Sequence, residues 1–417
     1  MSTSRPTPAR QQSLRAHNLA LVLTAIASAP SSTRARLAAE TGLTKATVSS
    51  LVDLLVAADL VVEAGPDATP AAVGRRGSSL TLSDAGPLGI GVEVNVDYLA
   101  TCTVDLTGRV RRRETIIGDE RGDGPDATLR RAAGALRRAL DDAAADDRPV
   151  AGITLAVPGL VESDHDIVRA APNLGWRDVR AAEVLAQEAG LAVPATEGVE
   201  VRLGNEADLA ALGELWVGGH GSLRSFLFVS GEIGVGAGIV VDGALFGGVR
   251  GFSGEIGHIT VDPNGPPCPC GNVGCLERLA GQERILTDAG IEPTAATTTA
   301  HADGPVAELV ARAAGGDARA LSAIDAAGRN LGLGLSVVLN AMDIDTVLLG
   351  GVYALLGPWL TAPVTEELER RVFAAPWSRP SVGVSTLGPE AAVRGAALNA
   401  IRTVLDDPFG YVSADVA

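Results

Sequence analysis

Apolar residues recur at helical spacing up to about residue 56, and shorter alternating segments follow. The spacing predicts helices over residues 13–28, 33–41 and 43–56. Alternation of apolar and polar residues then predicts strands at residues 60–63 and 79–82, joined by a loop rich in glycine, proline and alanine. Three helices followed by a hairpin are the order of elements in a winged helix-turn-helix.

The second and third predicted helices carry start and stop signals. Thr33 and Thr44 are expected N-caps, whose hydroxyl oxygens accept hydrogen bonds from otherwise unpaired backbone N–H groups. Gly42 fits the turn between the helices because glycine adopts a left-handed conformation at little cost. The expected apolar face of the third helix consists of Val48, Leu51, Leu54 and Leu55.

The exposed beginning of the third helix is the predicted DNA-reading surface. A helix-turn-helix places these positions against base edges in the major groove, and the only lysine of the chain, Lys45, lies among them. The loop of the hairpin adds Arg75 and Arg76, and a basic wing tip contacts phosphates or the minor groove. A small helical bundle with a solvated loop is the alternative interpretation. The predicted DNA contacts on the helix are Thr44, Lys45, Thr47, Ser49 and Ser50.

From residue 88 onward the pattern changes to strands, glycines and longer helices. Such alternation predicts an α/β fold of two lobes with a cleft between them. We therefore divide the chain into a winged helix-turn-helix domain, residues 1–85, and a two-lobed domain, residues 86–417. The elements expected in the second domain include a hairpin at 89–97 and 99–105, a helix over about 125–145, and strands at 150–157, 225–229, 237–241 and 345–349.

The charge of the chain is unevenly distributed. The net charge of −16 would by itself disfavour a nucleic-acid partner. Residues 1–80, however, contain eight Arg and Lys against five Asp and Glu, so this segment carries +3 and the remainder −19. This asymmetry indicates a nucleic-acid-facing end attached to an acidic body.

Composition excludes further classes of protein. Hydrophobic residues make up 46% of the chain, which is enough to bury a core and excludes general disorder. No stretch of about 18 uninterrupted apolar residues is present, so neither a membrane span nor a membrane partner is expected. Four cysteines in 417 residues are too few for a disulfide framework, and we expect a cytoplasmic protein.

Three of the cysteines, Cys268, Cys270 and Cys275, are crowded together a short distance after His258. One imidazole and three thiolates form a complete tetrahedral ligand set for Zn²⁺. Because four protein ligands leave no open position for water, the expected role of the metal is structural. Chance proximity of three buried cysteines is the alternative. Cys102 lies in a predicted strand and is expected to be an inert core residue.

Around these ligands the sequence resembles the ROK family, which includes repressors, open reading frames and sugar kinases. The resemblance rests on Glu-Ile-Gly-His at 255–258 and Cys-Pro-Cys-Gly-Asn-Val-Gly-Cys-Leu-Glu at 268–277, and it extends over residues 88 to about 403. The preceding winged helix, with its Gly-Arg-Arg segment, matches the repressor branch. The resemblance implies an actin-like ATPase fold, whose two lobes are hinged around a sugar cleft.

The resemblance also implies which residues contact the sugar. Carboxylates and amides pair with neighbouring hydroxyl groups, and a site built from them rejects analogues that leave its polar groups unpaired. His258 is expected to bind zinc through one ring nitrogen and the sugar through the other. For Asn173 and Asn205 a turn-forming role is an equally good interpretation. The implied sugar contacts are Asn173, Asn205, Glu206, Glu255, His258 and Glu277.

Three departures from the kinases of the family concern phosphoryl transfer. Their Asp-x-Gly-x-Thr loop corresponds here to Glu93, Asn95 and Asp97, so the glycine that admits phosphate is lost and acids are present. Their Gly-Thr-Gly-Ile-Gly loop corresponds to residues 232–236, which begin with another acid. Glu206 stands at the position of their general base, where an additional methylene shifts the carboxylate by about 1 Å. ATP binding is therefore not expected, and no catalytic residue is assigned.

The sequence thus favours a sugar-responsive transcriptional regulator, a repressor of carbohydrate-metabolism genes, without kinase activity. One winged helix contacts only half an operator, so a homodimer or higher homo-oligomer is expected on operator DNA. The alternative is a bifunctional ATP-dependent sugar kinase with a DNA-binding extension. Xylose, glucose, N-acetylglucosamine and phosphorylated sugars are all open as effectors, and activation is open beside repression.

Overall fold

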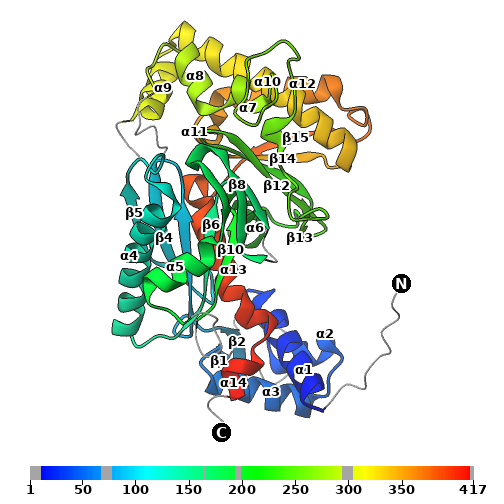
Figure 1. Ribbon diagram of the computed structural model, residues 1–417. Helices are drawn as coiled ribbons and strands as arrows, with labels where there is room; N and C mark the ends of the chain where they lie inside the picture. Colours follow the sequence, from blue (N-terminus) through cyan, green and yellow to red (C-terminus); the bar gives the residue numbers. More distant parts are fainter. Residues whose placement is uncertain (1–10, 67–77, 163–164, 193–198, 294–303, 414–417) are drawn as a thin grey trace, which may run out of the picture.

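A computed structural model describes residues 11–66, 78–162, 165–192, 199–293 and 304–413 of the protein. Figure 1 shows three parts in succession: a small helical domain at one end and two α/β lobes above it. This arrangement confirms the predicted fold class. None of the helices in the described ranges combines the length and apolarity that a bilayer crossing requires.

The small domain contains the helices and the hairpin that the apolar pattern predicts. Its elements are α1 (Gln11–Ala27), α2 (Arg34–Thr41), α3 (Lys45–Ala57), β1 (Val61–Pro66) and β2 (Ser78–Leu82). Thr33 and Thr44 cap α2 and α3 through their side chains, and Gly42 ends α2 with a φ of 72°. Strands β1 and β2 pair antiparallel, and Ser32 exchanges two backbone hydrogen bonds with Leu80 beside them.

The first lobe is built on a five-stranded sheet in the order β10-β6-β3-β4-β5. Its elements are β3 (Leu88–Val94), β4 (Tyr98–Asp105), β5 (Val110–Ile117), α4 (Gly124–Ala145), β6 (Val150–Val157), α5 (Ala181–Ala189) and β10 (Val201–Asn205). Strands β3, β6 and β10 run parallel, and β4 and β5 extend the sheet antiparallel. Helices α4 and α5 cover one face and α13 (Ala391–Asp406) packs against the other, which explains why β3 and β4 are buried throughout.

A three-stranded antiparallel sheet accompanies this lobe. It consists of β7 (Leu160–Glu162), β8 (Ile167–Ala171) and β9 (Trp176–Val179), with the short helix η2 (Pro172–Leu174) between β8 and β9. Gly175 ends η2 with a φ of 70°. The turn brings Asn173 to the cleft between the lobes.

The second lobe carries another five-stranded sheet, in the order β13-β12-β11-β14-β15. One face packs against a layer of helices in the largest apolar core of the molecule. The elements are β11 (Phe226–Gly231), β12 (Val235–Val241), β13 (Ala244–Leu245), η3 (Ile256–His258), α7 (Leu276–Ala280), α8 (Gln282–Asp288), α9 (Pro305–Ala314), α10 (Ala318–Met342), β14 (Thr346–Gly351), α11 (Val352–Leu355), α12 (Gly357–Arg371), β15 (Ser381–Val384) and η4 (Gly388–Glu390).

Helices α6 (Glu206–Val217) and α13 (Ala391–Asp406) cross closely between the two sheets. Small residues allow this approach, since a Cβ at Gly395 would lie 1.8 Å from the backbone oxygen of Leu209. In the same way, a Cβ at Gly91 in β3 would lie 2.2 Å from the backbone oxygen of Val393. Helix α13 is therefore fixed against both α6 and the first sheet.

The far end of α13 enters the core of the small domain, a contact that the local sequence pattern does not predict. It is followed by α14 (Phe409–Ser413), which packs against α1 and α3. The two ends of the chain thus share one apolar core, as the red and blue helices of Figure 1 show. From α13 this core contains Leu398, Ile401, Val404 and Leu405, and from α1 it contains Leu19, Val22, Leu23 and Ile26.

Candidate functional site

The beginning of α3 is the surface for which DNA contacts were predicted. Thr44, Lys45 and Ser50 are exposed there, whereas Thr47 and Ser49 are half-buried. The Thr44 hydroxyl accepts a hydrogen bond from the Thr47 N–H at 3.1 Å, and the two hydroxyl oxygens are 2.9 Å apart. The threonines therefore stabilise the helix start, and Lys45 supplies its cationic side chain. The predicted wing residues, Arg75 and Arg76, lie outside the described residues.

Ion pairs join α2, α3 and β1 on the surface of the small domain. Arg34 in α2 donates to Asp53 in α3 at 2.8 Å and to Glu63 in β1 at 2.5 Å. The hydrogen bond with Glu63 raises the pKa of Arg34, and the same contact lowers the pKa of Glu63. Exposed ion pairs contribute about 0–1 kcal/mol each, so the shared apolar core beneath carries more of the stability.

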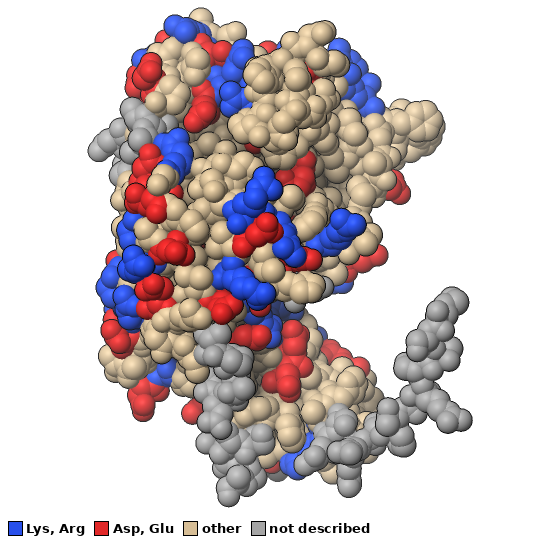
Figure 2. All heavy atoms as spheres, in the orientation of Figure 1, with Lys and Arg blue, Asp and Glu red and all other residues tan. Residues whose placement is uncertain are grey.

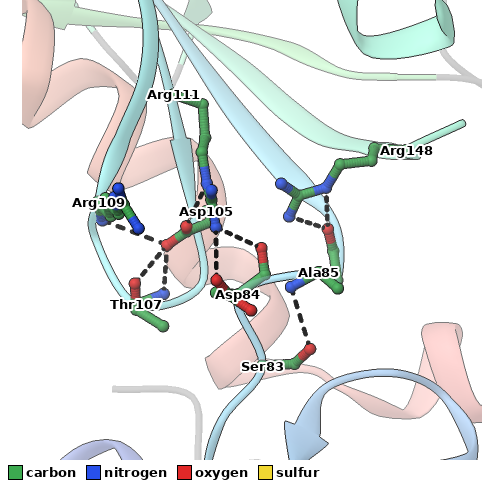
Figure 3. Close-up of polar contacts among 9 residues, drawn as sticks. Ser83, Asp84, Ala85, Asp105, Thr107, Arg109, Arg111 and Arg148 are labelled. Atoms are coloured by element: carbon green, nitrogen blue, oxygen red, sulfur yellow. Dashed lines mark hydrogen bonds and ion pairs between the residues drawn. The ribbon is translucent and has the colours of Figure 1, made fainter. Parts of the chain in front are cut away.

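The linker between β2 and β3 is held by two arginines of the first lobe (Figure 3). Arg111 on β5 donates to the backbone oxygen of Asp84 at 2.7 Å and to its carboxylate at 3.0 Å. The Nε of Arg111 donates to the fully buried carboxylate of Asp105 at 2.6 Å. Arg148 donates to the carbonyl of Gly86 at 2.9 Å. Because cations bind two of its carbonyls, the linker fixes the small domain to the lobe.

A cavity in the cleft between the lobes brings together all six residues for which sugar contacts were predicted. Its walls also include Asn95, Ser230 and Ser253, whose amide and hydroxyl groups can pair with a polyol. The sequence identifies Asn95 only as a departure from a phosphate loop, and no sequence motif marks the two serines as possible sugar contacts. The six predicted residues that line the cavity are Asn173, Asn205, Glu206, Glu255, His258 and Glu277.

Two glycines allow the loop after β11 to pass beside the acids of the cavity. A Cβ at Gly234 would lie 2.9 Å from Glu277 Oε2 and 3.5 Å from Asn173 Nδ2. A Cβ at Gly236 would lie 3.2 Å from Glu206 Oε1. A side chain at either position would have to displace the end of a neighbouring polar side chain of the cavity.

One histidine and three cysteines form the cluster that the sequence spacing predicts. The cluster borders the cavity. The ligand atoms of His258, Cys268, Cys270 and Cys275 all lie within 4.8 Å of one another. The sulfur atoms of Cys270 and Cys275 are 3.7 Å apart, and the sulfur of Cys268 lies 3.8 Å from His258 Nδ1. Bond lengths of about 2.0–2.3 Å around a tetrahedral ion give ligand separations of roughly 3.3–3.8 Å. The cluster is therefore compatible with a structural metal ion.

Glycines shape the loop that carries the cysteines. Gly271 and Gly274 have φ values of 95° and 63°, in the left-handed region. A Cβ at Gly274 would lie 1.6 Å from the backbone oxygen of Asp262, so no other residue fits. The N–H of Gly274 donates to the Pro266 carbonyl at 2.8 Å, which closes the loop.

His258 belongs to both the cysteine cluster and the cavity. Its Nδ1 faces the sulfur of Cys268, and its Nε2 lies 3.8 Å from Glu255 Oε2. Glu277 Oε1 lies 3.7 Å from Nδ1 and accepts a hydrogen bond from the Cys268 thiol at 2.9 Å. The imidazole thus presents one nitrogen to each site, and its predicted role of coupling a metal to a sugar stays a prediction.

Buried carboxyl groups form the base of the cavity. Burial, together with the neighbouring acids Glu255 and Glu93, raises the pKa of Glu206 to about 8. Burial also raises the pKa of Glu232 well above its usual range, with Asp97 as the next cause. One carboxyl oxygen of Glu206 has no hydrogen-bond partner among the residues that the structure describes. Glu206 consequently favours the protonated form near neutral pH.

The turn between β3 and β4, for which the sequence predicts a departure from a phosphate loop, is bordered by polar side chains that hydrogen-bond to one another. The Tyr98 hydroxyl donates to Glu93 Oε1 at 2.5 Å, and Asn95 Nδ2 donates to the Tyr98 oxygen at 3.1 Å. Burial raises the pKa of Glu93 to about 7 and that of Asp97 to about 6. Glu93 joins Glu206 in the lining of a smaller cavity at the base of the cleft.

The amide of Asn205 is engaged within the protein. Its oxygen accepts hydrogen bonds from the N–H groups of Ala207 at 2.8 Å and Asp208 at 3.1 Å, which caps α6. Its nitrogen donates to the Gly159 carbonyl at 2.9 Å. Asn205 therefore positions Glu206 at the cavity, while its own contact with a sugar stays a prediction. Asn173 is exposed at the edge of the cavity.

Comparison with known proteins matches most of the chain. Residues 89–403 match the ROK family, and residues 20–76 match the MarR family. The xylose repressor of Caldicellulosiruptor bescii is 29% identical over 402 residues, which cover 95% of this chain and 98% of that protein. The glucokinase of Halalkalibacterium halodurans is 31% identical over 314 residues, which cover 73% of this chain and 92% of that protein.

A solved structure extends this similarity to three dimensions. The crystal structure of a ROK family transcriptional regulator, a homologue of the E. coli MLC protein, superimposes with a TM-score of 0.76 at 26% identity. The match covers 97% of this chain and 99% of that chain. The similarity to regulators thus spans the small domain and both lobes together.

Proposed function

The chain belongs to the ROK family, and we propose that it is a sugar-responsive transcriptional repressor of carbohydrate-metabolism genes. The observation that carries this proposal is the extent of the similarity, since the xylose repressor and the ROK regulator each align with more than nine-tenths of the chain. The match of the small domain to the MarR family supports its role in binding operator DNA. The exposed start of α3 then enters the major groove, and the wing contacts the backbone or minor groove.

The effector in this proposal is a sugar bound in the cleft cavity. Carboxyl, amide and imidazole groups from both lobes converge there, and such groups pair with the hydroxyls of a sugar. Glu206 contributes a carboxyl oxygen that lacks a hydrogen-bond partner in the described ranges of the chain. A buried polar group without a partner costs free energy, so a ligand hydroxyl that pairs with it gains affinity.

The metal of the cysteine cluster is zinc in this proposal. Three thiolates and one imidazole suit zinc in number, chemistry and tetrahedral arrangement. His258, Cys268, Cys270 and Cys275 would hold the ion, which supplies a fixed cross-link between η3 and the cysteine loop. Such a cross-link would hold His258 with its Nε2 toward the cavity.

The protein acts without phosphoryl transfer in this proposal. Nucleotide phosphates require cations or backbone N–H donors, and the two loops at the base of the cleft instead present Glu93, Asp97 and Glu232. A bifunctional sugar kinase is the second candidate, which the similarity to a glucokinase favours. ATP-dependent phosphorylation of a sugar by the purified protein would establish the second candidate.

Helix α13 provides a route from the sugar to the operator. Its first residues, Ala391 and Ala392, line the smaller cavity beside Glu206 and Glu232. Its last turns lie in the core shared with α1 and α3. Closure of the cleft around a sugar would shift this helix, and allosteric couplings of this kind amount to about 1–3 kcal/mol.

A homodimer completes the proposal. Arginines and acids are interspersed over the face of the molecule seen in Figure 2, so the body adds no broad basic surface there for DNA. Two winged helices on a two-fold axis would instead add the contacts of two half-sites.

The test is operator binding measured with and without D-xylose, D-glucose and N-acetyl-D-glucosamine. The effector should weaken operator binding by roughly 5–150-fold. Glu255→Ala should remove this response while the affinity for operator without sugar stays near that of the wild type, because Glu255 lines the cavity and lies far from α3 in the chain. An operator affinity that ignores every sugar the protein binds would contradict the proposal.

A further inference from the structure

The sheet face that α4 covers in the first lobe changes from apolar to polar along β4 (Figure 1). Leu99 is buried in the core between this face and α4. Because alternate residues of a strand share a face, Thr101 and Thr103 follow Leu99 on the side of α4. Their partners on the edge strand β5 are Glu114 and Arg112. These residues and the second half of α4 line a pocket of about 460 Å³, hereafter the α4 pocket.

Two threonine hydroxyl groups belong to the buried side of the α4 pocket. Thr101 and Thr103 line it and are each only 4% exposed. Neither hydroxyl forms a hydrogen bond within the part of the chain that the structure describes. In the same sheet, by contrast, the buried hydroxyl of Thr154 accepts a hydrogen bond from Asn399 Nδ2 at 3.4 Å. A buried polar group without a partner costs free energy, so a ligand that pairs with the two hydroxyls gains affinity.

Charged side chains of both signs also line the α4 pocket. Arg138 and Glu114 satisfy each other, since Nε and Nη2 of the arginine donate to the two carboxylate oxygens at 3.1 and 2.8 Å. Arg112 has a 3.4 Å ion pair with Asp142, and both side chains are about half exposed. Asp141 forms no ion pair with any residue in the described ranges. The charged lining residues are Arg112, Arg113 and Glu114 on β5, and Arg138, Asp141 and Asp142 on α4.

The charges that are not fully paired lie on opposite sides of the pocket. Arg112 lies on β5, where its neighbour Arg113 is engaged by Glu390 outside the pocket. Asp141 and Asp142 lie at the end of α4, where the last C=O groups lack N–H partners and carry partial negative charge. The described last turn of α4 contains no basic residue. One side of the pocket therefore favours an anionic group and the other a cationic group.

We propose that the α4 pocket binds a small zwitterion of the α-amino-acid class. The ligand carboxylate pairs with Arg112 and with the hydroxyls of Thr101 and Thr103, all of which can donate to it. The ligand ammonium pairs with Asp141 and Asp142 at the negative end of α4. The lining carries three basic and three acidic side chains, which disfavours a ligand with net charge. The pocket lies outside the cleft, so this inference does not depend on the proposed function.

Thermal unfolding of the full-length protein with each proteinogenic L-amino acid, at about 10 mM, is the first test. At least one amino acid should raise the Tm, because a ligand that binds only the folded state stabilises it. The corresponding α-hydroxy acid and the decarboxylated amine each lack one of the two charges, and each should bind at least about tenfold more weakly. A Tm that no amino acid raises would overturn the proposal. Equal binding of the hydroxy acid or the amine would overturn the zwitterion.

Calorimetric titration of variants with that amino acid locates its site. Arg112→Gln and Asp142→Asn should each weaken binding by at least about tenfold. The matched control is Arg130→Gln, because Arg130 also lies on α4, makes an exposed 3.5 Å ion pair with Glu188 and is not among the described residues that line the pocket. Its affinity should equal that of the wild type. An unchanged affinity in Arg112→Gln would assign the ligand to another site and overturn the proposal.

Thr103→Val separates a ligand contact from a structural role. The substitution removes a hydroxyl that has no partner in the described chain, so the Tm without ligand should be unchanged or higher. The affinity for the amino acid should nevertheless fall by at least about threefold. Thr154→Val is the contrast, because that hydroxyl accepts a hydrogen bond from Asn399 and its loss should lower the Tm without changing the affinity. Full affinity in Thr103→Val would contradict the proposed contact with the carboxylate.

Discussion

The linker junction and the cleft cavity differ in whether their buried carboxyl oxygens have hydrogen-bond partners. At the junction, Asp105 is fully buried and accepts hydrogen bonds from the Thr107 N–H at 2.8 Å and from Arg111 at 2.6 Å. In the cleft, one carboxyl oxygen of Glu206 has no hydrogen-bond partner within the part of the chain that the structure describes. A buried acid with complete partners fixes the structure, whereas an unpartnered one costs free energy until a ligand pairs with it. The carboxyl group at the domain junction thus has its hydrogen-bond partners within the protein, whereas the cleft, where the effector is proposed to bind, leaves a carboxyl oxygen for a ligand.

The largest expected loss of stability is that of Cys270→Ser, at the cysteine cluster that borders the cleft cavity. The side chain of Cys270 is exposed, so without a metal its replacement should change stability by no more than about 0.5 kcal/mol. If Cys270 binds a structural zinc, the variant should lose the ion and about 3 kcal/mol or more, because metal binding and folding are coupled. Metal content and thermal unfolding with and without a chelator measure both effects. Cys102→Ser, outside the cluster, should keep one equivalent of metal, and a Cys270→Ser protein with full metal and unchanged Tm would contradict the assignment.

Arg111→Ala should destabilise the linker junction, where the buried Asp105 has its full set of hydrogen-bond partners. Its removal leaves the buried Asp105 without a cation and frees the backbone oxygen of Asp84, at an expected cost of about 1.5–3 kcal/mol. Urea unfolding should therefore shift to a lower midpoint. The matched control is Arg112→Ala on the same strand, since Arg112 makes an exposed 3.4 Å pair with Asp142 and should cost about 0–1 kcal/mol. Equal urea midpoints for the two variants would contradict the claim that the Arg111 contacts stabilise the linker junction.

Lys45→Ala should weaken operator binding without changing the stability of the protein. The ammonium is exposed at the start of α3, so stability should be unchanged while operator binding weakens by about 1–3 kcal/mol and the preferred sequence changes. Arg76→Ala is the comparison, because a wing arginine on the DNA backbone should weaken binding to all sequences and reduce its salt dependence. Competition assays with operator and unrelated DNA at two salt concentrations distinguish the two patterns. Retention of full sequence preference in Lys45→Ala would contradict the predicted base contact.

The smallest expected effect is the pH dependence that Glu93 confers. Its pKa is raised by burial from 4.5 to about 7, so the folded protein holds this proton more tightly than the unfolded chain does. The resulting stability is present below pH 4.5 and is lost as the pH rises through about 7. Glu93→Gln keeps an acceptor for the Tyr98 hydroxyl but cannot ionise. Between pH 6 and 8 the wild type should therefore lose about 1 kcal/mol more than the variant. Parallel stability profiles from urea unfolding would contradict this account.

Local patterns in the sequence predict a large part of the fold. Apolar spacing, threonine caps and a glycine turn depend on neighbouring residues, and the structure confirms the N-caps at Thr33 and Thr44 and the left-handed Gly42. The histidine and cysteine spacing correctly predicts a cluster because the ligands lie close in the chain. Family resemblance, rather than spacing, brings the distant residues Asn173 and Glu277 to one cavity.

Features that join distant parts of the chain were not predicted. Arg111 and Asp84 are 27 positions apart, and Arg148 and Gly86 are 62 apart, so no periodic pattern connects them. On α3 the expected apolar residue Leu54 is half-buried, whereas Val52 is fully buried. The reason is that α3 packs against α1 and α14 as well as its own domain's hairpin, which widens its buried face.

The core shared by the two ends of the chain limits how the protein can be divided or recombined. A chimaera that carried only residues 1–85 to another sensor would leave the apolar side chains of α1 and α3 without the partners that α13 and α14 supply. A transplantable DNA-binding unit therefore consists of both chain ends, with residues 391–413 included. The same constraint applies to sequence change, because a larger side chain on α1 requires a smaller one on α13 to keep the packing density.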